Sequence, residues 1–246
     1  MPHFFISTKN IENDLVVIDD KENYQHIARS LRAKIGENLK MIDENRIQYV
    51  GKIKNITKST IDVEIEKKYP SKNMLGFNLF LAQSPLRSDC QLLIIEKSTE
   101  LGIKGVYPVY TDNCAVAKSV IEKKIQKWSR VMYEASKQCE RAEIPDCFEL
   151  TTLESLVSSK SFDRIIAFCE RDYKLSMKDY FVECPVKKNE NILVIVGPEG
   201  GFSKREFELF KNSGIIMLSL GELILKAETA VIVGLGNIIY EFSNNK

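Results

Sequence analysis

Histidine is scarce in this chain of 246 residues, and the cysteines lack the spacing of a metal site. Only His3 and His26 are present, and the six cysteines are scattered without a C-x-x-C pair. Zinc clusters and histidine-dependent catalytic triads therefore have almost no residues to build on. In a reducing compartment, scattered cysteines serve as small core hydrophobes. We expect no metal site.

Excess charge and long apolar runs are absent as well. Lys and Arg number 35 against 34 Asp and Glu, a formal net charge of +1. This balance excludes a strongly basic nucleic-acid coat, so any contact with RNA must use local patches. No apolar run reaches membrane-spanning length, and the opening Met1-Pro2-His3 does not resemble a signal peptide. We expect a cytoplasmic protein.

The usual phosphate-binding motifs are missing too. A dinucleotide site would show G-x-G-x-x-G after an early strand, and a P-loop would show G-K-S or G-K-T. Neither pattern occurs in the sequence. A pocket for a ligand that carries a purine but no phosphate remains compatible with the chain.

The pattern of the chain changes near residue 70 and predicts two domains. Residues 1–72 contain short alternating strands and one helix over 22–33, typical of a small β-barrel or sandwich. The segment 69–73 reads as the linker. Residues 73–246 alternate strands with longer helices, the pattern of an α/β fold with a parallel sheet. Ser88 with Gln91, and Ser203 with Glu206, have the spacing of capping boxes and predict two helix starts.

The glycine turn after residues 191–196 is the most informative local feature. The run N-I-L-V-I-V predicts a strand buried on both faces, and G-P-E-G-G follows it directly. Gly197, Gly200 and Gly201 permit close approach of a ligand to the backbone. A carboxylate at Glu199 would repel phosphate, so the turn favours a ligand that is neutral or cationic at the contact.

Three loops follow three consecutive predicted strands, at residues 169–171, 197–201 and 221–226. In a parallel sheet such loops meet at one edge and form one pocket. The third loop contains Leu223, Ile224 and Leu225, which suit either an apolar slot for a flat ring or a β-bulge or buried connector. S-adenosylmethionine, with its adenine, ribose and cationic sulfonium, fits the first alternative.

Several motifs resemble one known family along nearly the whole chain. They are G-P-E-G-G-F-S-x-x-E at 197–206, L-G-x-x-I-L-K-x-E-T-A at 220–230, E-K-S-T-E-L-G-I at 96–103, E-A-S-K-Q-C-E-R-A-E-I-P at 134–145 and H-I-A-R-S-L-R-A-K-I-G-E at 26–37. The chain resembles the ribosomal RNA small subunit methyltransferase E family, of the SPOUT class.

The resemblance implies a PUA-like RNA-binding domain, a trefoil-knotted α/β methyltransferase domain and a homodimer. It also implies S-adenosylmethionine-dependent methylation of N3 of a uridine in 16S ribosomal RNA. The cofactor-binding residues predicted from the loops and the resemblance together are Phe168, Cys169, Glu170, Val196, Gly197, Pro198, Glu199, Gly200, Gly201, Leu220, Gly221, Leu223, Ile224, Leu225, Thr229 and Ala230.

The RNA side of the site is less distinctive. Glu134, Gln138 and Arg141 have the spacing of one helical face, and Arg141 with Gln138 is the predicted catalytic pair that orients the uracil or its phosphate. The alternative is that Arg141 is a solvated cation at a helix C-terminus. The predicted RNA contacts, with solvated surface cations as the alternative, are Arg29, Arg32, Lys34 and Lys226.

The chain also departs from the family pattern. His3 stands where an arginine is usual, Glu140 replaces a glycine, and Leu223 and Lys226 replace arginines. Each lost cation removes a phosphate contact, so RNA binding or substrate choice is affected first. The competing hypotheses are a non-catalytic RNA-binding or ribosome-assembly protein that keeps the fold, and an enzyme on another nucleotide-bearing substrate.

Overall fold

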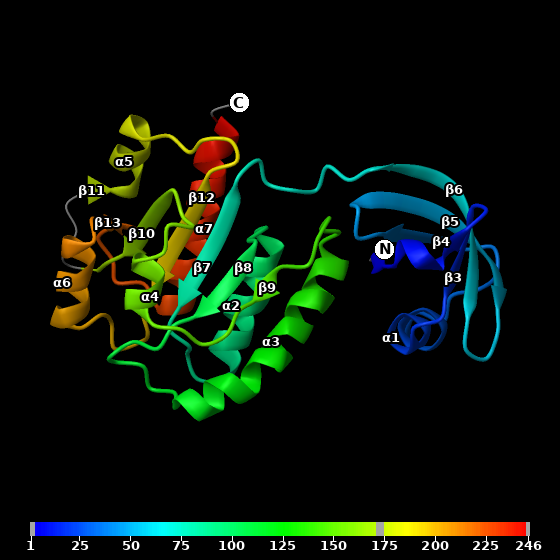
Figure 1. Cartoon of the computed structure of the whole chain (residues 1–246), viewed down its shortest axis with the longest axis horizontal. Helices are drawn as coiled ribbons and strands as arrows, with labels where there is room; N and C mark the ends of the chain where they lie inside the picture. The colour runs from blue at the N-terminus through cyan, green and yellow to red at the C-terminus, as the bar shows by residue number, and fades with distance from the viewer. Residues whose placement is uncertain (1–2, 171–174, 245–246) are drawn as a thin grey trace. The chain divides into compact units, whose positions relative to one another are not determined.

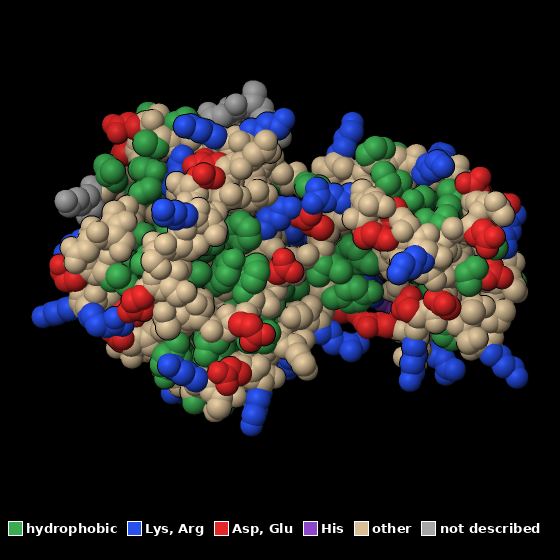
Figure 2. All heavy atoms as spheres, in the orientation of Figure 1, with side chains coloured by type: hydrophobic (Ala, Val, Ile, Leu, Met, Phe, Trp, Pro, Cys, Tyr) green, Lys and Arg blue, Asp and Glu red, His purple; other side chains and the backbone are tan. Residues whose placement is uncertain are grey.

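The protein, described here by a computed structural model over residues 3–170 and 175–244, divides into two compact units. The first unit comprises Met1–Met74 together with Ser136–Glu143, and the second comprises Leu75–Ala135 with Ile144–Lys246. Figure 2 shows basic and acidic side chains interspersed on the face that is drawn, as the near-zero net charge predicts.

The first unit contains a six-stranded mixed sheet. Its strands lie in the order β1 (His3–Phe5), β4 (Asn38–Ile42), β5 (Ile47–Ile56), β6 (Ile61–Pro70), β3 (Leu15–Ile18) and β2 (Ile11–Glu12). β1 pairs in parallel with β4, and the other pairs are antiparallel. Alternate residues such as Tyr49 and Ile53 on β5 enter the core, which explains the period-two pattern of the sequence.

Short helical segments connect these strands. They are η1 (Thr8–Asn10), α1 (Lys21–Tyr24) and η2 (Gln25–Ser30), the last being π-helical. The single helix predicted over 22–33 is therefore shorter and irregular. The predicted linker is also partly wrong, because Tyr69 and Pro70 pair with Gln48 and Ile47 and extend β6.

Residues 136–143 join the first unit through polar contacts. The Lys40 ammonium lies 2.7 Å from the Glu140 carboxylate, and the Arg46 guanidinium lies 2.8 Å from that of Glu143. The Asn73 side chain donates to the Glu140 carbonyl at 2.8 Å. One compact unit thus contains residues that are distant in sequence, and a single boundary along the chain cannot describe it.

The second unit contains a seven-stranded sheet in which every pair is parallel. The order is β11 (Leu175–Ser176), β13 (Ile216–Ser219), β10 (Arg164–Phe168), β12 (Asn191–Val196), β7 (Asn78–Gln83), β8 (Gly105–Pro108) and β9 (Asp146–Cys147). The α/β fold with a parallel sheet is confirmed. The trefoil knot stays a prediction.

Helices cover both faces of this sheet (Figure 1). One hydrophobic cluster contains residues of α2 (Ser88–Glu100), α3 (Lys118–Gln138), α5 (Met177–Glu183) and α7 (Ala227–Asn244). A second cluster contains residues of α4 (Leu153–Val157) and α6 (Lys204–Asn212). On β12, Val194 enters the first cluster and Leu193 the second, so the strand is buried on both faces as predicted.

Two predicted helix starts have different outcomes. Ser203 and Glu206 form the predicted capping box of α6, each side chain bonding the other's backbone N–H. The prediction that Ser88 caps α2 is wrong, because Ser88 is already helical and Arg87 occupies the cap position. The Gln91 side chain instead accepts from the Leu86 N–H at 2.8 Å. Among the described residues, no helix is both long and apolar enough to cross a membrane.

Candidate functional site

The carboxyl ends of three adjacent parallel strands open onto one pocket. β10 ends at Phe168, β12 at Val196 and β13 at Ser219, and β10 lies between the other two. The loops that follow enclose a pocket of about 840 Å³. Open parallel sheets bind ligands at such an edge, since the loops of neighbouring strands converge there.

The structure brings most of the predicted cofactor-binding residues together at this pocket. Those lining it are Phe168, Cys169, Glu170, Val196, Gly197, Pro198, Glu199, Gly200, Gly201, Leu220, Gly221, Leu223, Ile224, Leu225 and Ala230. Thr229 is not among the lining residues and is exposed in the first turn of α7. Arg171, in the first predicted loop, lies outside the described residues.

Other lining residues escaped the sequence analysis. They are Cys90, Phe202, Phe207, Ser219, Ala227 and Glu228, and Lys226 lines the pocket although it was predicted as an RNA contact. Phe202 follows Gly201 directly, and its place beside the glycine turn is the signal in the sequence that points to it. Cys90 lies on α2, and nothing in its local sequence indicates that it reaches this edge.

One wall of the pocket is the glycine wall, residues 197–203. The Asn113 side chain donates to the carbonyls of Gly200 and Gly201 at 3.2 and 3.1 Å. The Glu206 carboxylate, which is 0% exposed, accepts from the Ser203 N–H at 2.8 Å and the Asp112 N–H at 2.9 Å. Gly201 has φ +67°, a conformation that favours glycine. The wall is therefore held from outside the pocket.

The opposite wall is the leucine wall, residues 220–226. Leu223 and Ile224 are 82% and 60% exposed, so the alternative that they form a buried connector is wrong. The Ser219 hydroxyl donates to the Gly221 carbonyl at 2.8 Å and accepts from its N–H at 3.1 Å. Apolar side chains exposed beside a pocket are suited to contact a ligand.

Phe168 forms part of the pocket lining and packs closely against α7. A β-carbon at Gly234 would lie 2.1 Å from the Phe168 ring, so only glycine fits there without movement. The ring is 7% exposed, which leaves little room for it to shift. The position of this lining residue therefore depends on α7.

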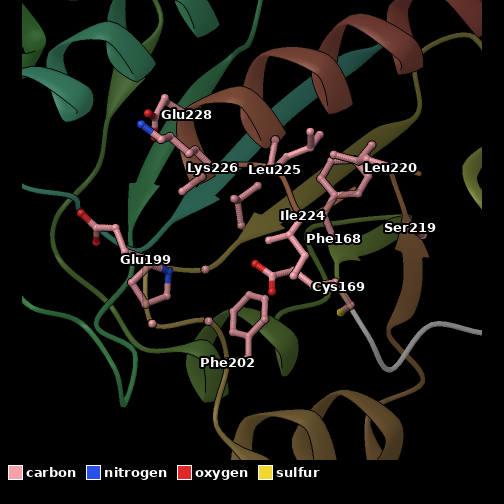
Figure 3. Close-up of a pocket in the computed structure, with 18 of the residues that line it drawn as sticks. Phe168, Cys169, Glu199, Phe202, Ser219, Leu220, Ile224, Leu225, Lys226 and Glu228 are labelled. Atoms are coloured by element: carbon pink, nitrogen blue, oxygen red, sulfur yellow. The ribbon is translucent and has the colours of Figure 1, made fainter. Parts of the chain in front are cut away.

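Charged and apolar residues separate within the pocket. Figure 3 shows Phe168, Leu220 and Ile224 on one side and Lys226, Glu228 and Glu199 toward the other. The Glu228 carboxylate lies 3.9 Å from the Cys90 sulfur. Among the described lining residues, three carboxylates (Glu170, Glu199 and Glu228) accompany one cation, Lys226. This balance favours a ligand with net positive charge.

Arg141 and Gln138, the predicted catalytic pair, belong to the first unit and are not among the residues lining this pocket. They also do not share a helical face, because α3 ends at Gln138 and Glu140 adopts φ +57°. A left-handed residue terminates a helix, and only glycine signals that position clearly in a sequence. Arg141 is buried and its Nε donates to the Glu143 carbonyl at 3.1 Å; burial lowers its pKa.

The predicted RNA contacts Arg29, Arg32 and Lys34 lie in the first unit near η2 and are exposed. None of the three forms an ion pair with any residue of the described chain. Exposed unpaired cations can meet phosphate oxygens without first breaking an internal bond.

His3, one of the departures from the family pattern, is buried in the first unit. It is 1% exposed, and within the described residues neither ring nitrogen has a hydrogen-bond partner. Burial lowers its pKa to about 4, with Glu140 opposing and Lys40 adding to the shift. A neutral buried imidazole cannot replace an arginine as a phosphate contact.

The comparisons with known proteins agree with this architecture. A family model described as an RNA methyltransferase domain matches residues 73–239, and one described as an RNA methyltransferase PUA domain matches residues 18–66. A ribosomal RNA small subunit methyltransferase E of Buchnera aphidicola is 27% identical, covering 96% of this chain and 91% of that protein. The protein of the same name from Aquifex aeolicus is 29% identical, covering 94% of this chain and 96% of its own.

Solved structures show the same fold. A putative methyltransferase from Legionella pneumophila, in complex with S-adenosylmethionine, has a TM-score of 0.82 and 27% identity and covers 97% of both chains. A ribosomal RNA small subunit methyltransferase E from Neisseria gonorrhoeae, bound to S-adenosylmethionine, has a TM-score of 0.82 at 24% identity, covering 97% of this chain and 96% of that one. Because the first family model spans more than half of its length, this chain belongs to the RNA methyltransferase family.

Proposed function

We propose that the protein is an S-adenosylmethionine-dependent methyltransferase that methylates N3 of a uridine in 16S ribosomal RNA. The observation that carries this proposal is the pocket at the strand ends of the parallel sheet, in a chain that belongs to the RNA methyltransferase family. Its relatives are named as small-subunit ribosomal RNA methyltransferases, and the Legionella pneumophila protein binds S-adenosylmethionine in the same fold. A ribosomal substrate implies that the protein works in the cytoplasm.

The residues of the pocket fit this cofactor. The apolar group around Phe168, Leu220 and Ile224 suits an adenine ring, and the carboxylates suit a cationic sulfonium. The cofactor carries one carboxylate, and Lys226 is the one cation among the described lining residues. We therefore place its methionine end toward Lys226, with its ammonium toward Glu228.

S-adenosylmethionine supplies an electrophilic methyl group on its sulfonium. For uridine N3 to accept it, the N3 proton must leave to water or a carboxylate, and negative charge must be tolerated on the base. The protein's contribution is to orient both reactants in the pocket and to exclude water from the apolar side. Arg141 and Gln138 stay the candidates for orienting the uracil, and unchanged turnover in Arg141→Ala would remove Arg141 from that role.

The RNA would be held by the exposed cations Arg29, Arg32 and Lys34 of the first unit. Reversing the charge of Arg29 and Arg32 should weaken RNA binding and reduce its salt dependence. The homodimer implied by the family resemblance also belongs to this proposal. Sedimentation of the full chain measures it directly, and a monomer at micromolar concentration would contradict it.

Two measurements test the proposed function. Calorimetry should detect binding of S-adenosylmethionine to the purified protein. Mass mapping of 16S ribosomal RNA from a deletion strain should reveal one uridine that lacks a methyl group and regains it when protein and cofactor are added. A protein that binds RNA but not S-adenosylmethionine would instead be the non-catalytic alternative. RNA with cytidine at the mapped position controls for specificity.

A further inference from the structure

Residues 111–113, which follow β8 and do not line the pocket, contact the glycine wall at three points. The Asn113 amide donates to the Gly200 and Gly201 carbonyls at 3.2 and 3.1 Å. The Asp112 carboxylate accepts from the Ser203 hydroxyl at 2.5 Å. Outside the wall, the Asp112 N–H donates to the buried Glu206 carboxylate at 2.9 Å. We refer to residues 111–113 as the bracing segment.

The bracing segment is itself anchored in the core of the second unit. Thr111 is 2% exposed, and its hydroxyl lies 2.7 Å from that of buried Ser84. The Ser84 N–H in turn donates to the Val196 carbonyl at 3.1 Å, at the end of β12. Asn113 therefore extends from a fixed point and does not simply follow the glycine wall.

Asn113 also limits the space behind the glycine wall. A β-carbon at Gly200 would lie 3.0 Å from the Asn113 Cβ, so the two backbones approach closely. Both carbonyls that Asn113 binds belong to residues that line the pocket. Holding these carbonyls fixes the planes of the peptide groups that follow Gly200 and Gly201, because peptide groups are planar.

We propose that Asn113 is a positioning residue for the cofactor pocket: by donating to two glycine carbonyls from outside, it holds the glycine wall in the conformation that binds ligand. The inference rests on the proposed function, since that function identifies S-adenosylmethionine as the ligand that the glycine wall contacts. It assigns a role to a residue 87 and 88 positions away from the glycines it binds.

The isosteric variant Asn113→Asp tests this inference, because it replaces the donor with an oxygen that repels both carbonyls. Calorimetry with S-adenosylhomocysteine, the product that remains when the cofactor has lost its methyl group, should show about tenfold weaker binding. Asn113→Ala, which removes the donor without adding repulsion, should lose about threefold. Gln126→Glu, at an exposed position of α3, makes the same change of charge away from the site and should bind as wild type.

Two further measurements distinguish a positioning role of Asn113 from a purely structural one. The melting temperature without ligand should shift by less than about 2 °C, since Asn113 is exposed. Amide exchange at residues 200–202 should accelerate in Asn113→Asp alone among these charge variants. Binding within twofold of wild type in Asn113→Asp would overturn the inference. So would a loss of affinity that comes with a fall in melting temperature of more than about 2 °C. If the wild type binds neither S-adenosylmethionine nor S-adenosylhomocysteine, the proposed function fails instead.

Discussion

The two walls of the pocket are built in opposite ways. The glycine wall contains three glycines and is held by hydrogen bonds with Asn113, Asp112 and Glu206. The leucine wall has large apolar residues and exposes Leu223 and Ile224 to water. Hydrogen bonds within the chain hold the first wall, whereas the second presents apolar surface that a bound ligand can bury. Substitutions in the two walls should therefore separate stability from affinity.

The largest effect is expected from Glu206→Gln behind the glycine wall. The amide has one acceptor oxygen for two backbone donors, so the Ser203 or the Asp112 N–H would lose its partner in a buried place. We expect a loss of roughly 2 kcal/mol in the free energy of unfolding, measured by urea denaturation. Cofactor affinity should fall as well. A variant as stable as wild type would show that the glycine wall needs no such support.

The double substitution Leu223→Ser with Ile224→Ser should have the converse effect. Both side chains are already largely in water, so the unfolding free energy without ligand should change by less than about 0.5 kcal/mol. Affinity for S-adenosylhomocysteine should fall about tenfold, because burial of apolar surface on binding is lost. Val182→Ser, at a position 76% exposed and outside the pocket lining, is the matched control. Equal losses of stability and affinity would erase the contrast between the walls.

A smaller effect is expected from Lys226→Met at the end of the leucine wall. If Lys226 meets the carboxylate of the cofactor, S-adenosylhomocysteine should bind about fivefold more weakly, the strength of one exposed ion pair. Methylthioadenosine lacks the amino-acid part and should bind the variant and the wild type alike. Lys127→Met on α3 controls for the lost charge. If both ligands bind the variant more weakly by the same factor, Lys226 does not contact the carboxylate of the cofactor.

The smallest effect is expected from Arg205→Gln beside the glycine wall. Arg205 donates to Asp112 at 3.0 and 2.7 Å and also pairs with Glu154, but its side chain is 58% exposed. Exposed pairs contribute little and are screened by salt. The change in stability should be near the resolution of urea denaturation and should disappear at high salt. A large loss would mean that Arg205, rather than Glu206, holds the glycine wall.

The ion pair of Arg205 with Asp112 should make the stability of the protein depend on pH in a defined direction. Two hydrogen bonds hold the pKa of Asp112 below its ordinary value: the larger cause is the bond from Arg205 and the smaller is the bond from Ser203. Their contribution is therefore present above the unfolded pKa of about 3.9 and is lost as the pH falls through the lower folded value. NMR titration of the Asp112 carboxyl measures this directly: its pKa should lie below the ordinary value in wild type and should rise in Arg205→Gln, because the largest cause of the shift is lost.

Much of the leucine and glycine walls could be predicted from the sequence, because both follow apolar strands directly. The parallel sheet brings Phe168, Val196 and Ser219 to one edge, and this follows from the alternation of strands and helices. The support could not be predicted in the same way. Asn113 meets the glycine wall through strand order, and no local pattern states which strands become neighbours. The bond from the Ser203 N–H to Glu206 is the exception, because the spacing of a capping box predicts it.

The prediction that Arg141 shares a helical face with Gln138 is wrong for a different reason. Periodicity placed Gln138 and Arg141 on one helix, but the left-handed conformation of Glu140 ends it first. A glutamate carries no signal for that conformation, and here its carboxylate is held by Lys40 at 2.7 Å. The prediction failed where tertiary contacts support a backbone geometry that the residue type disfavours.

Gly234 has a consequence for engineering this protein. Glycine within a helix costs up to about 1 kcal/mol relative to alanine, so replacing it is a common route to higher thermal stability. At Gly234 that route is closed, because the new methyl group would displace Phe168 and reshape the pocket. Gly236, two residues further along α7, faces open space and accepts the same replacement. The helix α7 thus contains one glycine whose replacement would disturb the pocket and another whose replacement should raise thermal stability.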